Sequence, residues 1–256
     1  MINQWKCSFR TLVCLLALSV GVLSACESTS KEDSVHKTAH NTLSEAEIKD
    51  GWKLLFDGKT TKGWHVYNHG DTTSKWSVEN GELWCNPKSQ AGDFGDLVSD
   101  STYQNFEMTY DWKIAKGGNG GVFINVQESP KNPTAYMTGL EMQLLDNENG
   151  EERHKINPTH WAGCLYDISG KAENSKPKPF GEWNHSRIVH RDGRVIFFLN
   201  GLKTADATIT APDWKTKVQK SNLRNFPDFA KAISGKIALQ DHTDAVWFRN
   251  MKIREL

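Results

Sequence analysis

Short runs in which apolar and polar residues alternate recur along most of this chain, and they constrain its fold more than any other feature. In LEMQLL (140–145), three apolar residues alternate with Glu141 and Gln143, which is the period of a β-strand with one buried face. The expected strands are 52–56, 76–78, 82–84, 96–99, 106–114, 121–127, 140–145, 187–191, 194–199, 235–240 and 245–255. Asp192-Gly193, between two of these runs, predicts a two-residue hairpin turn. Many short strands in a chain of this length predict an all-β sandwich or barrel.

Helical patterns are weak and local. Ser44 and Glu47 stand at the spacing of a capping box, which predicts a short helix at about 44–50. A second short helix is expected near 213–223. Both are expected in connections, so they leave the all-β assignment unchanged.

The first 25 residues have the features of a secretory signal. Lys6 and Arg10 precede an apolar run that ends at Leu23, and this run is too short to predict a transmembrane helix. The segment LSAC follows, and its Cys26 stands where a bacterial lipoprotein carries its lipid. We therefore expect residues 1–25 to be a lipoprotein signal peptide and Cys26 to be lipidated. The lipid would be the only membrane contact, and it would hold the protein in the cell envelope, on a periplasmic or outer-membrane surface. The alternative is an ordinary secretory signal.

The rest of the chain divides into a polar segment and one domain. Residues 26–43 offer almost nothing to bury and are predicted to form a disordered tether, while residues 44–256 form a single domain. The 256-residue chain has 31 basic and 31 acidic residues, and removal of the signal leaves 29 basic ones. Without a basic excess, the chain is not expected to bind nucleic acid. Cys85 and Cys164 fit no metal-binding spacing and are expected to be small, semi-buried side chains.

Eight segments together point to one family. In chain order they are LFDGKTTKGWH, KWSVENGELW, GGNGGVFINVQE, GLEMQLLDNE, WAGCLYD, GEWNHSRIV, LNGLK and IALQDHTDAVWFRNMKIREL. Each segment alone is weakly diagnostic, but all eight in this order over residues 51–256 are specific. The chain resembles the 3-keto-disaccharide hydrolase family, which is common in secreted proteins of Bacteroidetes-like bacteria. The resemblance implies a concanavalin A-like jelly roll of two antiparallel sheets, and an activity that cleaves glycosides oxidised at C3 of the sugar.

Alternation predicts which side chains would line a groove in such a sandwich. One face of each sheet packs into the core, and the other face of one sheet lines the groove. The predicted groove residues are Phe123, Asn125, Gln127, Glu141, Gln143, Gln240, His242, Trp247 and Arg249. Tyr166 is added as a possible hydrogen-bonding group and Trp183 as a ring that could stack on a sugar. Asn119, in GGNGG, is expected to shape a tight turn.

The implied chemistry assigns roles to these residues. A ketone at C3 acidifies the C2 hydrogen, so the reaction needs a base, a donor for the enolate oxygen and an acid for the departing group; elimination and later addition of water give net hydrolysis. We predict Glu141 and His242 as the acid–base pair and Arg249 as the electrophile. Substrate would be bound or oriented by Asn125, Gln143, Asp146, Tyr166, Trp183, Gln240 and Trp247. A divalent cation could assist, with Glu141, Asp146 and His242 as ligands, but no metal motif is present and no cofactor is certain.

Two other functions remain open at this point. Glu141, Gln143 and Asp146 resemble the E-x-D-x-x-E run of laminarinase-type glucanases, although retaining hydrolysis needs two carboxylates about 5 Å apart and the middle acid is an amide here. The alternatives are therefore a laminarinase-like glycoside hydrolase and a non-catalytic carbohydrate-binding module. If the substrate is a 3-keto-glycoside, a separate sugar C3-oxidoreductase is expected in the same pathway.

Overall fold

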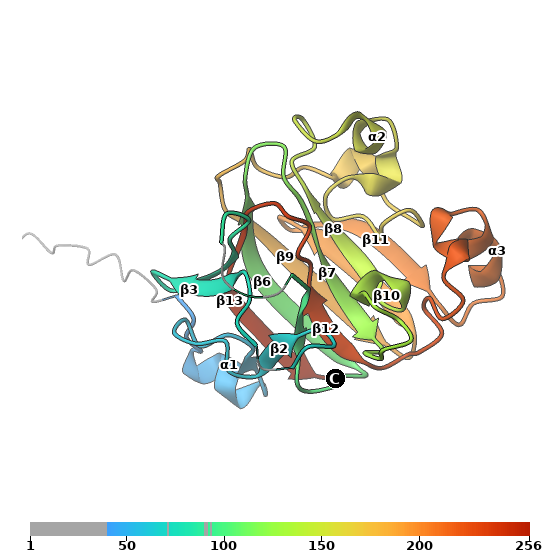
Figure 1. Cartoon of the computed structure of the whole chain (residues 1–256). Coiled ribbons are helices and arrows are strands. Elements are labelled where there is room, and N and C mark those ends of the chain that lie inside the picture. Colours follow the sequence, from blue (N-terminus) through green and yellow to red (C-terminus); the bar gives the residue numbers. More distant parts are fainter. Residues whose placement is uncertain (1–39, 71, 90–91, 93) are drawn as a thin grey trace, which may run out of the picture. The chain divides into compact units, whose positions relative to one another are not determined.

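The computed structural model describes residues 40–70, 72–89, 92 and 94–256. The predicted signal peptide, Cys26 and most of the predicted tether lie outside these residues. The described chain forms two antiparallel β-sheets packed face to face, with short helices in the connections (Figure 1). This is the jelly-roll sandwich that the sequence predicts. Within the described residues, no helix is long and apolar enough to cross a membrane.

The larger sheet has eight strands. Its order is β11 (Leu202–Thr208), β10 (Arg194–Leu199), β9 (Asn184–Arg191), β6 (Phe106–Ile114), β13 (Val246–Glu255), β4 (Glu82–Cys85) and β3 (Trp76–Glu79), and β1 (Lys53–Leu54) pairs with β13. The predicted hairpin is confirmed, because Asp192 and Gly193 join β9 to β10 with φ of 49° and 80°. Positive φ at both central positions is typical of the turns that match strand twist.

The smaller sheet has five strands and carries the cavity described below. Its order is β2 (Trp64–Val66), β5 (Leu97–Ser99), β12 (Lys236–Leu239), β7 (Asn119–Val126) and β8 (Leu140–Leu145). Long connections join these strands. They contain η1 (Ala135–Met137), α2 (Glu152–Lys155), η2 (Pro158–His160), η3 (Ala172–Asn174), α3 (Trp214–Gln219) and η4 (Asn222–Asn225). The helix expected near 213–223 is thus present as α3 followed by η4.

The space between the sheets is filled by large apolar side chains. Fully buried examples are Phe56, Phe106, Met108, Tyr110, Trp112, Ile124, Leu140, Met142, Phe197 and Phe248. A second, smaller cluster lies on the opposite face of the small sheet and includes Phe123, Val126 and Ala135. Both faces of the small sheet are therefore partly covered, so polar side chains on its outer face are also buried.

The domain begins before the predicted boundary at residue 44. Asn41 is only 8% exposed; it exchanges 2.8 Å hydrogen bonds with Asn250 of β13, and its Nδ2 donates to the Gly81 carbonyl at 2.8 Å. Asn41 therefore belongs to the fold rather than to a disordered tether. The predicted capping box is confirmed: Ser44 caps α1 (Glu45–Lys49), and its backbone N–H donates to Glu47 Oε2 at 2.8 Å.

Two expectations about groove residues are wrong. Trp247 and Arg249 do alternate with buried residues on β13, but β13 lies in the large sheet, so these side chains do not share a surface with Glu141. Asn125 has φ of 59°, and the pairing of β7 with β12 shifts register nearby. This irregularity turns Asn125 into the core, where its Nδ2 lies 3.2 Å from Nε2 of buried His190.

Candidate active site

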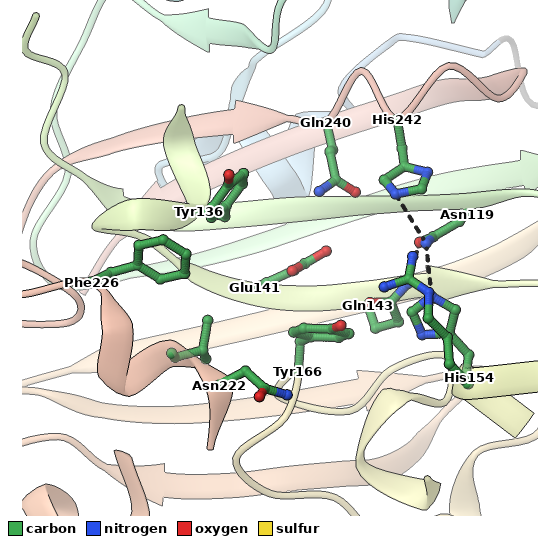
Figure 2. Close-up of a pocket in the computed structure, with 12 residues that line it drawn as sticks. Asn119, Tyr136, Glu141, Gln143, His154, Tyr166, Asn222, Phe226, Gln240 and His242 are labelled. Carbon is green, nitrogen blue, oxygen red and sulfur yellow. Dashed lines mark hydrogen bonds between the residues drawn. The ribbon is translucent and has the colours of Figure 1, made fainter. Parts of the chain in front are cut away.

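A cavity of about 260 Å³ opens on the outer face of the small sheet (Figure 2). Its lining residues are Asn119, Tyr136, Glu141, Gln143, Arg153, His154, Tyr166, Asn222, Leu223, Phe226, Gln240 and His242. They come from β7, from β8, from the segment after β12 and from three connections. The sheet supplies the floor of the cavity and the connections supply its walls.

Strands β7 and β8 place Glu141 at the centre of the floor. Glu141 and Gln143 project outward because Leu140, Met142 and Leu144 fill the core face. Gly121 on β7 leaves the space that the Glu141 side chain occupies. A methyl group at Gly121 would lie 2.2 Å from Glu141 Oε1 and 2.9 Å from its Cδ, so the glycine is required for this carboxylate position.

The Glu141 carboxyl is buried and poorly solvated. It is 8% exposed, and no described residue donates a hydrogen bond to its side-chain oxygens. Burial, and to a lesser degree the negative charge of Asp96, raise the pKa of Glu141 well above its usual value. Asp96 is itself buried, and burial raises its pKa to about 6. A carboxyl group with a raised pKa is either a proton donor near neutral pH or, once ionised, a stronger base than an exposed glutamate.

Asn119 connects the floor to two histidines. Gln143 Nε2 donates to the Gly120 and Leu144 carbonyls, both at 3.2 Å, and to Asn119 Oδ1 at 2.6 Å. Since backbone carbonyls only accept, the orientation of the Gln143 amide is fixed, and it fixes that of Asn119 in turn. The Asn119 Nδ2 group then faces His154 Nε2 at 3.2 Å and His242 Nε2 at 3.4 Å. Both imidazoles therefore present an unprotonated Nε2 to Asn119.

His154 is backed by a second buried histidine. Its Nδ1 lies 3.2 Å from Nδ1 of His160, whose Nε2 lies 3.2 Å from Asp167 Oδ1. Burial, followed by the nearby Arg153 charge, lowers the pKa of His154 to about 4. His154 is therefore neutral near neutral pH, with its proton on Nδ1 and directed to His160.

Tyr166 and Arg153 add hydrogen-bond donors to the wall. The Tyr166 backbone N–H donates to the Glu141 carbonyl at 3.1 Å, and the Tyr166 ring stacks on His160 at 4.4 Å. Burial raises the pKa of the Tyr166 hydroxyl to about 12, so this group stays protonated. Arg153 Nε donates to Glu151 at 2.5 Å, and the Arg153 side chain reaches the cavity from α2.

The opposite end of the cavity is apolar. Tyr136 and Phe226 pack edge to face, with ring centroids 5.2 Å apart, and Leu223 lies beside them. Figure 2 shows Glu141 between this end and the end formed by Asn119, His154 and His242. The cavity therefore combines a carboxyl group, several fixed polar groups and an aromatic wall.

The structure brings five of the predicted site residues together around one cavity. They are Glu141, Gln143, Tyr166, Gln240 and His242. The Oε1 atom of Gln240 is buried without a hydrogen-bond partner in the described part of the chain, so it is an acceptor that a substrate hydroxyl could satisfy.

Three other predicted residues lie on the outer face of the large sheet, away from the cavity. The Arg249 guanidinium sits 3.9 Å from the ring of Trp183, and its Nε is 3.6 Å from Asp111 Oδ2. Trp247 stacks on Trp84 at 5.6 Å. These contacts form a covering layer on that sheet.

Asp146 also lies outside the cavity lining. Its Oδ2 accepts hydrogen bonds from the Gly117 backbone and the Asn149 side chain, both at 2.9 Å, so it holds the chain that leaves β8. The proposed cation ligands Glu141, Asp146 and His242 therefore do not converge. Within the described residues, no group of three or more His, Cys, Asp or Glu is arranged to hold a metal ion.

Several cavity residues were not found by the sequence analysis. Asn119 could have been found, because it lies two residues before Gly121 and four before Phe123 on the outward face of β7. Arg153 and His154 lie in α2, and Tyr136 and Phe226 lie in other irregular connections, where no period marks a facing direction. Only the three-dimensional path of these connections brings them to the cavity.

Residues 51–254 match the 3-keto-alpha-glucoside-1,2-lyase-like domain family. The chain belongs to this family. A relative from Bacteroides thetaiotaomicron, named 3-keto-disaccharide hydrolase, is 32% identical over an alignment that covers 97% of this chain and 98% of the relative.

Two solved structures from Parabacteroides distasonis are also similar, and both proteins are assigned as glycosyl hydrolases. The first is 36% identical, with a TM-score of 0.76, and the match covers 85% of this chain and 100% of that one. The second is 25% identical, with a TM-score of 0.59, and the match covers 80% and 99%. The family match at residues 51–254 includes β7 and β8, which carry the floor of the cavity.

Proposed function

We propose that this protein cleaves glycosides whose sugar carries a ketone at C3, by elimination across C1 and C2 followed by addition of water. Membership in the 1,2-lyase-like family and the name of the Bacteroides relative support this substrate class. The observation that carries the proposal is the buried carboxyl of Glu141, which is the only acidic group among the residues that line the cavity and fills the space left by Gly121.

The reaction needs one proton to leave and one to arrive. A base takes the C2 proton, and the electron pair moves onto the C3 oxygen as an enolate. The enolate then expels the C1 substituent, whose oxygen is protonated, and a C1–C2 double bond forms. Water adds to C1 and a proton returns to C2, so the net change is hydrolysis. The barrier falls when donors are already positioned at the enolate oxygen.

Glu141 is the base in this scheme. Its raised pKa suits removal of a proton next to a ketone, because a more basic carboxylate gives a better match to that weak acid. Arg153 is the candidate donor to the C3 oxygen, in place of Arg249. The departing oxygen can be protonated by the Tyr166 hydroxyl or by Nδ1 of His242, since Nε2 of His242 accepts from Asn119. The variants described below separate these two groups.

The geometry disfavours a laminarinase-like mechanism. That mechanism needs two carboxylates facing the scissile bond, about 5 Å apart when configuration is retained. Among the residues that line this cavity, Glu141 is the only acidic one, and Asp146 is bound to backbone and amide groups elsewhere. One carboxyl group is sufficient for elimination, since the same group can take and return the C2 proton.

The cellular setting is part of the proposal. The signal-like segment and Cys26 support a lipid-anchored protein of the cell envelope. The proposed substrate already carries a ketone at C3, so a separate sugar C3-oxidoreductase is expected to supply it. Loss of fatty-acid labelling in Cys26→Ser, with the chain still exported, is expected; labelling that persists would contradict the anchor.

The central test uses a 3-keto-glucoside with a chromogenic leaving group, beside the unoxidised glucoside. The purified protein should release the chromophore from the keto substrate alone. Glu141→Gln should lower kcat by about 10²–10⁴-fold, which is the usual contribution of a general base. Tyr166→Phe and His242→Ala then identify the acid, because only the variant that lacks it should become more sensitive to the pKa of the leaving group.

Two outcomes would contradict the proposal. Equal release from oxidised and unoxidised substrates would indicate ordinary hydrolysis. Release from neither, together with tight binding of sugars on a glycan array, would favour the non-catalytic binding module.

A further inference from the structure

The two ends of the cavity differ in chemical character, and Glu141 lies between them (Figure 2). One end presents the hydrogen-bonding side chains of Asn119, Gln143, His154 and His242. The other presents two aromatic rings and a leucine. A ligand that spans both ends must therefore have one polar part and one apolar part.

Hydrogen bonds of the backbone fix the two segments that carry the aromatic rings. Tyr136 lies in η1, where the Ala135 N–H donates to Asp96 Oδ2 at 3.2 Å. The connection that carries Phe226 is tied to the same place, because the Ala230 N–H donates to the Thr138 carbonyl at 2.9 Å. Two segments distant in sequence are thus fixed so that the rings of Tyr136 and Phe226 meet.

These rings remain accessible although they lie beside a hydrophobic cluster. Tyr136 is 37% exposed and Phe226 is half-buried, whereas neighbouring Ala135 is fully buried. Among the described residues, no group hydrogen-bonds the Tyr136 hydroxyl. Accessible aromatic surface inside a cavity is stabilised when an apolar ligand covers it, and an aromatic ring of the ligand can pair with it offset or edge to face.

The polar end suits the keto-sugar. The sugar ring carries hydroxyls that need hydrogen-bond partners, and C1 and C2 must lie near Glu141 for the proton transfer of the proposed function. The substituent on C1 then points away from the polar end, toward Tyr136 and Phe226. This assignment rests on the proposed function, since it uses Glu141 as the reacting group.

We propose that Tyr136, Phe226 and Leu223 form a subsite for the leaving group, and that it selects 3-keto-glycosides with a flat aromatic leaving group over those with a second sugar. Asn222 lies at the rim of this subsite, and its backbone N–H is fixed by Asp167 at 2.8 Å. Its side-chain amide can bind a polar substituent of the ring. A second sugar would need more such partners than the aromatic end offers.

The test compares an aryl 3-keto-glucoside with a 3-keto-disaccharide, by following the 3-keto-sugar product that both release. Phe226→Ala and Tyr136→Ala should each lower kcat/KM for the aryl substrate by about tenfold or more, mainly through KM, because each loses burial of an aromatic ring. The same variants should change kcat/KM for the disaccharide by less than about threefold. Phe180→Ala is the matched control, since Phe180 is an exposed aromatic residue outside the cavity lining.

Equal losses for both substrates, or no loss for either, would overturn the subsite. So would a preference for the disaccharide that depends on Asn222 more than on Phe226. If no keto substrate is turned over, binding of the aryl 3-keto-glucoside, measured by calorimetry, tests the subsite on its own. Weaker binding to Phe226→Ala than to wild type would keep the subsite while the proposed reaction fails, and unchanged binding would reject both.

Discussion

The two sheets are held in register by different means. In the large sheet, three two-residue turns join neighbouring strands, at Asn80-Gly81, Asp192-Gly193 and Asn200-Gly201, and all six residues have positive φ. In the small sheet, consecutive strands β7 and β8 are joined by residues 127–139, and the other pairings link segments distant in sequence.

The outer faces of the two sheets also differ, in how deeply their polar side chains are buried. The large sheet presents stacked rings and partly buried ion pairs, such as Lys113 with Glu82 at 2.8 Å. The small sheet buries Glu141 and Gln143 beneath its long connections. The comparison indicates that local turns secure the scaffold, while long-range connections create the low-dielectric surroundings that perturb a carboxyl group.

Gly121→Ala should have the largest effect, and it tests whether the position of the Glu141 carboxyl is critical. The new methyl group would displace the Glu141 carboxyl, because it would lie 2.2 Å from Oε1. We expect kcat to fall by about 10²-fold, which a displacement of about 1 Å can cause. The strand has no positive φ at this glycine, so the melting temperature should change little. Full activity in Gly121→Ala would show that the position of Glu141 is not critical.

A second test contrasts two arginines, one from each surface. Arg153→Gln should lower kcat/KM by about 10–100-fold, because a hydrogen bond to a charged oxygen contributes about 1.5–3 kcal/mol. Arg249→Gln should change kcat/KM less than about threefold, since Arg249 packs on Trp183 in the large sheet. Steady-state kinetics on the chromogenic keto-glucoside measure both. If Arg249→Gln lowers kcat/KM more than Arg153→Gln does, then Arg249 is the electrophile and Arg153 is not the donor to the C3 oxygen.

A third test concerns the large sheet alone. Gly201 has φ of 84°, and nothing lies within 4 Å of the site where a methyl group would be. Gly201→Ala should therefore destabilise the fold by about 1–2 kcal/mol through backbone strain alone. Activity below the melting transition should remain. Denaturant unfolding measures the change, and a loss of kcat without loss of stability would indicate that the two sheets are coupled.

The smallest expected effect is a pH dependence of stability. The folded state raises the pKa of Glu141, so its favourable contribution is complete below the usual pKa of about 4.5 and is lost as pH rises through the raised value. Glu141→Gln cannot lose a proton there. The melting temperature of the variant, relative to wild type, should therefore increase from pH 4.5 to pH 8. Comparing the two proteins cancels the opposite contribution of His154, whose pKa is lowered. A constant difference across this range would contradict a buried, poorly solvated Glu141.

The sequence predicts the strands except β2 and β11, and it predicts most facing directions, because period-two patterns record burial directly. Leu140, Met142 and Leu144 face the core as expected, and Glu141 faces the cavity. Alternation does not tell which sheet a strand joins, and this is why Arg249 was placed on the wrong surface.

The positions of two other residues, Asn125 and His154, could not be predicted from the sequence for physical reasons. The positive φ of Asn125 interrupts the alternation of β7, and Asn125 is one of the residues that adopt this conformation without an obvious local signature. His154 reaches the cavity only because the connection after β8 folds back over the sheet. Such a path depends on contacts between distant segments, which periodicity does not encode.

The division of the cavity between strands and connections has a consequence for how such enzymes diversify. Glu141 and Gln143 belong to a strand, whereas Tyr136 and Phe226 belong to residues 127–139 and 209–235. Under the proposed mechanism, replacement of these two segments would alter which leaving group is accepted, while Glu141 keeps its position on β8. Related enzymes can therefore acquire new glycosides by exchanging loops, and a mutagenesis library limited to these segments would explore substrate range with little risk to the chemistry.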